Sequence, residues 1–224
     1  MRNHFRRDFD ALQQDLALLG ALAERSLDKA LAALRDRDAP LARQVVAWDA
    51  EVDAQENRIH EECLKMLALH QPVASDLRRI GAAMMITTDL ERMGDLAEEI
   101  AERACAIAVG PPIPIPDKLQ RMSDLTTMMV RQALDAFVNL NADQAERVLR
   151  MDDEVDRYND EIIQELIKSM KDSPVMIEPG LSLFSATRHL ERIADHATNI
   201  AEDVIYLISG EIVRHRSNAE GPLT

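Results

Sequence analysis

Four pairs of acidic residues, the members of each pair four positions apart, are the part of this sequence best suited to bind a metal ion. The pairs are Asp49 with Asp53, Glu91 with Asp95, Asp152 with Asp156, and Glu191 with Asp195. Residues four positions apart lie on the same face of an α-helix, about one turn from each other. If the helices that carry two such pairs are neighbours, their carboxylates converge in one groove. Rigidly held oxygen ligands favour a hard cation such as Mg²⁺, Mn²⁺ or iron.

Further acidic residues extend the Glu91 pair into a stripe. On a helical wheel Glu98 and Glu102 fall in line with it, and Glu99 lies at its edge. The second copy carries Asn199 at the position of Glu99, and we include both residues among the candidate ligands. Because the apolar side of this helix lies opposite, we expect the stripe to be exposed rather than a buried catalytic pair. An acidic stripe is also the ordinary solvated face of an amphipathic helix, but its recurrence in both halves favours a site.

Other residues that could carry chemistry are fewer. His60, His189 and His196 could join a metal site, although a single histidine on a helix is more often a surface or core-edge residue. The Glu-x-x-His spacing of ferritin-like di-iron proteins does not occur. The sequence also has no glycine-rich phosphate loop, no Gly-x-Ser-x-Gly motif and no zinc-type Cys/His cluster. We therefore expect a binding protein rather than an enzyme.

The elements that must position the acidic pairs are long helices. Prolines mark the turns, because proline lacks an N–H donor and disfavours helix in the residue before it. Pro40 and Pro72 separate three helices in the first half, and breaks at Pro174 and at Pro179-Gly180 interrupt the second half. The expected helices are 8–34, 41–69, 75–109, 118–140, 142–170 and 181–209. The sequence thus predicts an all-α fold with essentially no β-sheet.

The two halves of the chain repeat each other. The run Asp49 to Asp53 reappears as Asp152 to Asp156, and Leu-Glu-Arg at 90–92 reappears at 190–192, each time followed by an Asp. Two matches in the same order indicate an internal duplication that gives two tandem three-helix bundles. The expected division is 1–109 for the first bundle, 110–117 for a Pro-rich linker, 118–210 for the second bundle and 211–224 for a flexible C-terminal tail. Gly94 in the middle of a helix predicts the close approach of another backbone.

The charge and the apolar content of the chain indicate which partners and which cellular location we expect. The net charge of −14 repels nucleic acid and anionic membranes, and the basic clusters Arg2/Arg6/Arg7 and Arg214/His215/Arg216 fall at the termini, where we expect solvated tails. The first residues lack an apolar signal region, and the apolar stretches are too short to span a bilayer. We expect a cytoplasmic protein in which Cys63 and Cys105 are buried.

Together these motifs make the chain similar to the PhoU family of bacterial phosphate-signalling proteins. The resemblance rests on Gln71-Pro72-Val73-Ala74-Ser75-Asp76-Leu77-Arg78, on 89–95 and on 189–200, and it covers nearly the whole chain. It implies a flat pair of three-helix bundles and a cytoplasmic negative regulator of phosphate uptake and of phosphate-starvation (Pho regulon) signalling. The implied partners are the ATPase subunit of the phosphate ABC transporter and a phosphate sensor histidine kinase, and a homodimer is possible.

The resemblance also bears on the acidic pairs. Some members of the family bind multinuclear iron or zinc clusters through Glu/Asp-x-x-x-Asp motifs, which correspond to the four pairs named above. The ion could thus be iron, zinc, manganese or magnesium, and the sequence leaves its identity open. This chain departs from the family pattern by carrying Glu99 in the first half where the second keeps Asn199. The alternative function is a metal-dependent enzyme or a metal-storage protein that uses the duplicated acidic helices.

Overall fold

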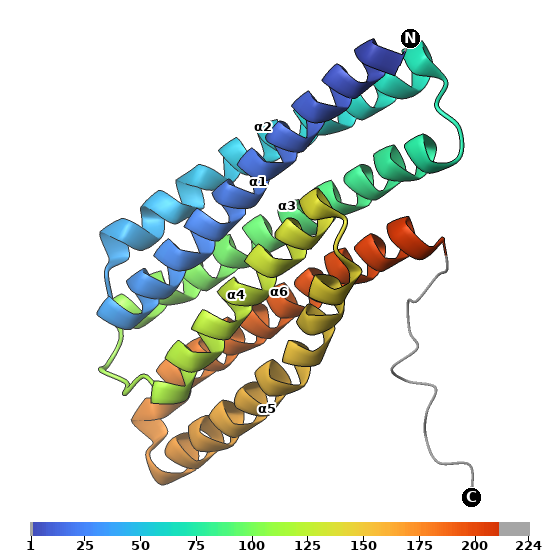
Figure 1. Cartoon of the computed structure of the whole chain (residues 1–224). Helices are drawn as coiled ribbons and strands as arrows, with labels where there is room; N and C mark the ends of the chain where they lie inside the picture. The colour runs from blue at the N-terminus through green and yellow to red at the C-terminus, as the bar shows by residue number, and fades with distance from the viewer. Residues whose placement is uncertain (1, 211–224) are drawn as a thin grey trace, which may run out of the picture.

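The computed structural model describes residues 2–210, and these form six α-helices, one short 3-10 helix and no strand. Met1 and residues 211–224, which include the predicted C-terminal tail, lie outside the described residues. The helices are α1 (Arg2–Asp36), α2 (Ala39–His70), α3 (Ser75–Val109), α4 (Asp117–Asn139), α5 (Ala142–Asp172) and α6 (Ile177–Ser209), with the 3-10 helix at Pro174–Met176 (Figure 1). The all-α prediction is confirmed.

Local sequence signals account for both ends of α2 and for the start of α5. The Asp38 carboxylate accepts a hydrogen bond of 2.9 Å from the backbone N–H of Leu41, which caps α2 at its N-terminus. At the other end Gln71 adopts a left-handed conformation with φ of 45°, and Pro72 follows it. The side chain of Asn141 caps α5 in the same way as Asp38 caps α2.

One predicted break was wrong. Pro179 and Gly180 do not form a break between helices, because both lie in the first turn of α6. The backbone N–H groups of the first turn have no partner within a helix, so proline is tolerated there. Gly180 leaves room for Met170, since a Cβ atom at this position would lie 2.8 Å from Cγ of Met170 and the methionine side chain would have to move. The break therefore falls only at Ser173 and the 3-10 helix that follows.

The start of the chain also differs from expectation, because α1 begins at Arg2 rather than at Asp8. Arg6 and Arg7 therefore belong to a helix and not to a solvated tail. Phe5 holds these first turns in place: its ring stacks on Phe9 with centroids 6.1 Å apart and meets the ring of His70 edge-on at 5.5 Å. This anchoring contact joins α1 to α2 and is invisible in a local sequence pattern.

The two bundles share one continuous apolar core. Helices α3 and α6 run antiparallel through the centre and pack on each other, as Figure 1 shows. Helices α1 and α2 complete the first bundle around α3, while α4 and α5 complete the second around α6. Helix α3 thus contacts α1, α2 and α6, and it is buried over most of its circumference.

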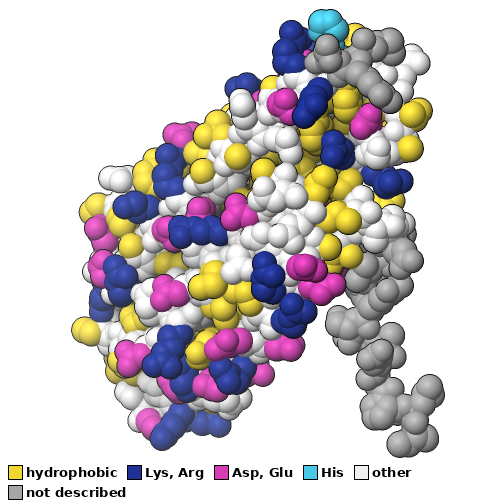
Figure 2. All heavy atoms as spheres, viewed as in Figure 1, with side chains coloured by type: hydrophobic (Ala, Val, Ile, Leu, Met, Phe, Trp, Pro, Cys, Tyr) yellow, Lys and Arg dark blue, Asp and Glu magenta, His cyan; other side chains and the backbone are white. Residues whose placement is uncertain are grey.

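Three further expectations concern composition. Cys63 is buried as predicted, and burial raises the pKa of its thiol to about 12, whereas Cys105 is only partly buried. Among residues 2–210 no helix combines the length and apolarity needed to cross a bilayer. Acidic and basic side chains are interspersed over the face shown in Figure 2.

Candidate metal centre

Helices α2 and α3 bring three carboxylates together on the surface of the first bundle. Asp49 and Asp53 extend from consecutive turns of α2, and Asp95 extends from α3. Ligand oxygens of the three side chains all lie within 4.8 Å of one another. Oδ1 of Asp49 is buried and has no hydrogen-bond partner in the described part of the chain. A buried carboxylate oxygen without a partner is costly, so this arrangement fits a cation.

Gly94 allows the two helices to approach at this point. A Cβ atom on Gly94 would lie 2.9 Å from Cγ1 of Val52, which is itself buried between Asp49 and Asp53 along α2. The close neighbour is therefore a valine side chain, and the predicted contact with another backbone is corrected. The absence of one methyl group draws the acidic edges of α2 and α3 together.

The acidic stripe is less exposed than expected. The side chain of Glu91 is only 16% exposed, and the carboxylates of Glu56 and Asp53 lie near it, so it belongs to the junction of α2 and α3. Burial and the neighbouring Asp95 raise the pKa of Glu91, and burial together with Asp53 and Asp95 raises the pKa of Asp49. Arg92 offsets part of this repulsion, since its Nη1 lies 2.8 Å from Oδ2 of Asp95.

The second bundle repeats this arrangement between α5 and α6. Burial, followed by the carboxylates of Asp156 and Asp195, raises the pKa of Asp152 to about 7. Glu191 lies beside them with its side chain 13% exposed, and Oδ1 of Asp152 and Oε2 of Glu191 are both buried without a partner among the described residues. Arg188 offsets part of the negative charge here, as Arg92 does in the first bundle, because its Nη1 lies 3.1 Å from Oε1 of Glu191.

The two grooves differ in how tightly the acidic groups converge. Among the described residues, only the groove between α2 and α3 brings three ligand atoms within 4.8 Å of one another. The position that corresponds to Gly94 in the second bundle is Ala194, whose methyl group is fully buried. The four pairs thus form two grooves, and the first is the more compact.

Two of the ten candidate ligands lie elsewhere. Asn199 donates a hydrogen bond of 3.2 Å to Oδ1 of Asp89, and Glu99 has its Oε2 2.9 Å from Nδ1 of His189. These contacts join α3 to α6, so both residues face the junction of the two bundles. His196 belongs to the same junction, because its Nδ1 lies 2.8 Å from Oδ1 of Asp89. Neither His189 nor His196 therefore reaches an acidic groove.

Asp89 was not among the predicted functional residues. It is 8% exposed and lies between the buried residues Ile86 and Leu90 on α3. The available signal was its helical spacing, since Asp89 lies three positions after Ile86 and four before Met93, both of them buried, and a buried charge requires a partner. His60 lies near the first groove with its Nδ1 4.0 Å from Oε1 of Glu56, and its Nε2 has no partner among the described residues.

Comparison with known proteins identifies relatives along nearly the whole chain. The PhoU domain matches residues 16–104 and again residues 119–204. A phosphate-specific transport system accessory protein PhoU homolog of Pseudomonas putida is 40% identical over 214 residues, which cover 94% of this chain and 83% of the relative. A homolog with the same name from Deinococcus radiodurans is 38% identical over 208 residues, covering 90% and 98%.

Solved structures agree with the sequence relatives. The crystal structure of PhoU from Pseudomonas aeruginosa superposes with a TM-score of 0.88 at 38% identity and covers 92% of this chain and 100% of that one. The phosphate transport system regulatory protein PhoU from Streptococcus pneumoniae also gives a TM-score of 0.88, at 32% identity, covering 93% and 99%. The repeated domain match, the relatives and the fold establish that this chain belongs to the PhoU family.

Proposed function

We propose that this protein is an accessory regulator of a phosphate-specific transport system and that it acts by contacting partner proteins, not by catalysis. The support is its membership of the PhoU family over both bundles and the names of its relatives, which are accessory or regulatory proteins of phosphate transport. The proposed location is the cytoplasm, where the ATPase subunit of an ABC transporter and the kinase domain of a sensor are both accessible.

The proposed regulation is negative. When phosphate is plentiful, the protein restrains phosphate uptake and Pho regulon signalling by linking the transporter ATPase to the sensor histidine kinase. The acidic character of the chain supports electrostatic steering towards basic partner surfaces, so we expect binding to weaken as the salt concentration rises.

A gene deletion tests the regulatory role. In the deletion strain we expect phosphate-uptake genes to be expressed despite ample phosphate, and the wild-type gene should restore repression. Glu191→Lys with Asp195→Lys should mimic the deletion if the second groove shapes the contact surface. The matched control is Asp135→Lys with Asp172→Lys, since both residues are exposed and lie outside the grooves. Normal repression in the deletion strain would refute the proposal.

We further propose that both grooves bind metal ions. The proposed ligands are Asp49, Asp53, Glu91 and Asp95 in the first groove and Asp152, Asp156, Glu191 and Asp195 in the second. The observation that carries this proposal is the cluster of three carboxylates with the buried, unpartnered Oδ1 of Asp49. Iron, zinc, manganese and magnesium all accept oxygen ligands. When bound, the cation supplies positive charge that relieves the repulsion between carboxylates and joins the two helices of a groove.

Elemental analysis and thermal unfolding test the metal proposal. The wild-type protein should retain metal after purification and unfold at a higher temperature with Mn²⁺, Fe³⁺ or Zn²⁺ than with a chelator, because a ligand of the folded state stabilises it. Asp49→Asn with Asp95→Asn should remove the metal of the first groove and leave that of the second. Asp135→Asn serves as the control. An absence of retained metal, together with no thermal shift for any of the three ions, would contradict the proposal.

A further inference from the structure

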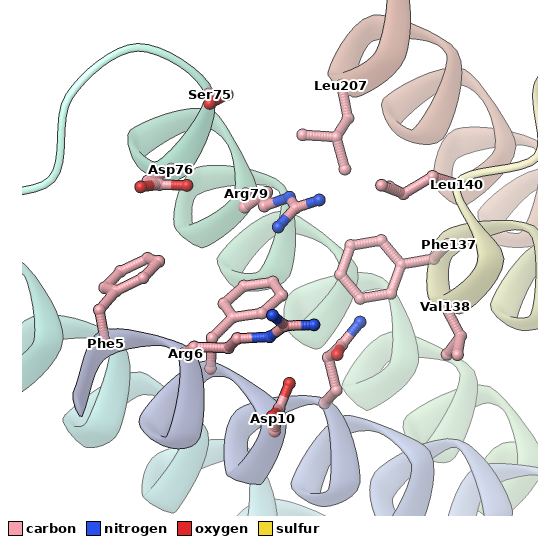
Figure 3. A pocket seen from close by; sticks show the side chains of 12 residues that line it. Phe5, Arg6, Asp10, Ser75, Asp76, Arg79, Phe137, Val138, Leu140 and Leu207 are labelled. Carbon is pink, nitrogen blue, oxygen red and sulfur yellow. The ribbon is translucent and has the colours of Figure 1, made fainter. Parts of the chain in front are cut away.

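A cavity of about 660 Å³ and the first acidic groove differ in how their charges are balanced. The cavity opens where α1 begins, and its walls come from α1, α3 and the ends of α4 and α6 (Figure 3). Its lining holds Arg6 and Arg79 together with Asp10 and Asp76, and the guanidinium group of Arg79 packs over the ring of Phe9. The charges of this cavity are therefore balanced within its own lining. The groove between α2 and α3 lacks such a balance.

The acidic face of α2 continues for two turns beyond Asp53. Glu56 and His60 share an arc of about 60° with Asp49 and Asp53, because each residue of an α-helix advances about 100°. Nδ1 of His60 lies 4.0 Å from Oε1 of Glu56, which is beyond hydrogen-bonding distance. Nε2 of His60 is buried and has no partner among the described residues. The imidazole of His60 therefore has a nitrogen available for a ligand.

Glu91 of α3 lies beside this part of α2. The side chains of Glu56 and Glu91 are only 21% and 16% exposed. Burial and the carboxylate of Asp95 raise the pKa of Glu91, and the carboxylates of Glu56 and Asp53 add to this rise. Arg92 offsets only part of the repulsion, because its guanidinium group is divided between Glu91 at 3.4 Å and Asp95 at 2.8 Å. Two mostly covered carboxylates next to an unpartnered imidazole are costly, and a cation would remove that cost.

His60 lies too far along α2 to share the ion of the three-carboxylate cluster. Asp53 and His60 are seven positions apart, which corresponds to about 10 Å along a helix axis. The cluster itself consists of Asp49, Asp53 and Asp95. An ion bound by His60 is therefore a second ion, further along the same groove.

The second groove lacks this extension. When the halves are aligned on Asp53 and Asp156, Glu56 corresponds to Asn159 and His60 corresponds to Ile163. Isoleucine has no ligand atom, and the amide of asparagine carries no charge to offset that of a cation. Carboxylates suit hard cations such as Mg²⁺, whereas an imidazole nitrogen suits zinc and other later transition metals. The two grooves thus differ in the types of ligand that they offer.

We propose that Glu56, His60 and Glu91 form a second cation position in the first groove and that this position binds Zn²⁺. His60 supplies a nitrogen ligand, and the two glutamates supply oxygen ligands and negative charge. The position makes the first groove selective for zinc, while the second groove offers oxygen ligands only. This inference rests on the metal binding proposed above and adds a ligand that lies outside the four acidic pairs.

Calorimetric titration with Zn²⁺ tests the inference on the full chain. Asp152→Asn with Asp195→Asn removes ligands of the second groove, and this double variant is the parent for all the others. We expect His60→Gln to weaken zinc binding at one position about tenfold or more, since loss of even an outer-shell partner typically costs about 10- to 100-fold in metal affinity. Glu56→Gln should have the same effect. The Mg²⁺ affinity should remain that of the parent, because magnesium takes oxygen ligands.

X-ray absorption at the zinc edge provides a readout that a purely structural role of His60 would not change. The zinc-loaded parent should show the outer-shell scattering of an imidazole ring, and His60→Gln should lose it. His4→Gln, which replaces an exposed histidine of α1, is the matched control and should keep both the zinc affinity and the imidazole signal. Circular dichroism confirms that each variant is folded.

The outcomes separate this inference from the metal proposal. If the wild-type protein binds neither zinc nor any other ion, both are overturned. If zinc binds to the parent without an imidazole signal, or binds equally well to the parent and to His60→Gln, the second cation position is overturned and the metal proposal stands.

Discussion

Replacement of Asp152 by Asn should stabilise the metal-free protein at neutral and alkaline pH. Burial and the carboxylates of Asp156 and Asp195 raise the pKa of Asp152 from 3.8 to about 7, so the folded protein disfavours its ionised form. The stability that the protonated group provides is fully present below about pH 4, falls as the pH rises towards 7, and is absent above that. Asn remains uncharged throughout and removes the penalty.

The size of the effect follows from the pKa. One pKa step is worth about 1.4 kcal/mol, so the rise from 3.8 to about 7 corresponds to roughly 4 kcal/mol as an upper bound. Partial solvent exposure screens the interaction, and coupling to Asp156 and Glu191 spreads it over several groups, which leaves about 1 to 2 kcal/mol at pH 8. For a chain of this length that is a rise in the unfolding temperature of about 2 to 8 °C.

Urea unfolding with a chelator present, at several pH values between 4.5 and 8.5, is the suitable assay. The difference between Asp152→Asn and wild type should grow with pH and level off above about pH 7. Asp135→Asn, at an exposed position of α4 away from this cluster, provides the matched control and should change stability little at any pH. A stabilisation that is the same at every pH, or a variant less stable than wild type at pH 8, would refute the reasoning.

Two other substitutions test the contacts that shape the site. Gly94→Ala should destabilise the protein by about 1 kcal/mol in urea unfolding, since the overlap with Val52 outweighs the gain in helix propensity. Calorimetry should show weaker Mn²⁺ binding in the first groove only. An unchanged Mn²⁺ affinity would show that the spacing of α2 and α3 does not determine binding at this site. Asp89→Ala should lower stability by about 1 to 3 kcal/mol in the same assay, because it removes the acceptor of His196 and Asn199. Asp135→Ala, at an exposed position, should stay within about 0.5 kcal/mol of wild type, and an equal loss in both variants would contradict a specific role for Asp89.

The parts of the fold that the sequence predicted well depend on local chemistry. Prolines mark the turns on both sides of α2, since Pro40 lies in its first turn and Pro72 lies two residues after its end, and α3 was predicted with its observed bounds. The misplaced ends depend on contacts between helices. Helix α1 extends to Arg2 because Phe5 packs on His70 of α2, and Gly180 stays helical against Met170 of α5. No pattern within one segment contains that information.

In the candidate site too, the sequence predicted what depends on spacing within one helix and missed what depends on contacts between helices. The helical spacing placed Asp49, Asp53 and Asp95 on facing sides of two helices, and the structure brings them together. The helical spacing could not show which interface Glu99 belongs to. A helical wheel with one apolar side describes a helix with one buried face, whereas α3 packs against the three helices α1, α2 and α6. A residue at the edge of the acidic stripe can therefore lie in the neighbouring interface between α3 and α6, where Glu99 contacts His189.

The central interface shows what the duplication has and has not preserved. If the halves are aligned on their Leu-Glu-Arg motifs, Asp89 corresponds to His189, and Glu99 corresponds to Asn199. The contact between Asp89 and Asn199 and the contact between Glu99 and His189 are therefore related by the repeat. In both, α3 provides the carboxylate and α6 provides the nitrogen.

This arrangement makes the two halves complementary rather than equivalent. A second copy of the first half in place of the second would set Asp89 against a carboxylate in the position of Asn199, and two neighbouring carboxylates repel each other. A copy of the second half opposite itself would pair His189 with Asn199 and lose both acceptors. The acidic pairs that form the grooves are the same in each half, whereas the residues that join the halves have diverged. The bundles thus repeat the same candidate binding chemistry, whereas the polar contacts that join them need one residue type from each half.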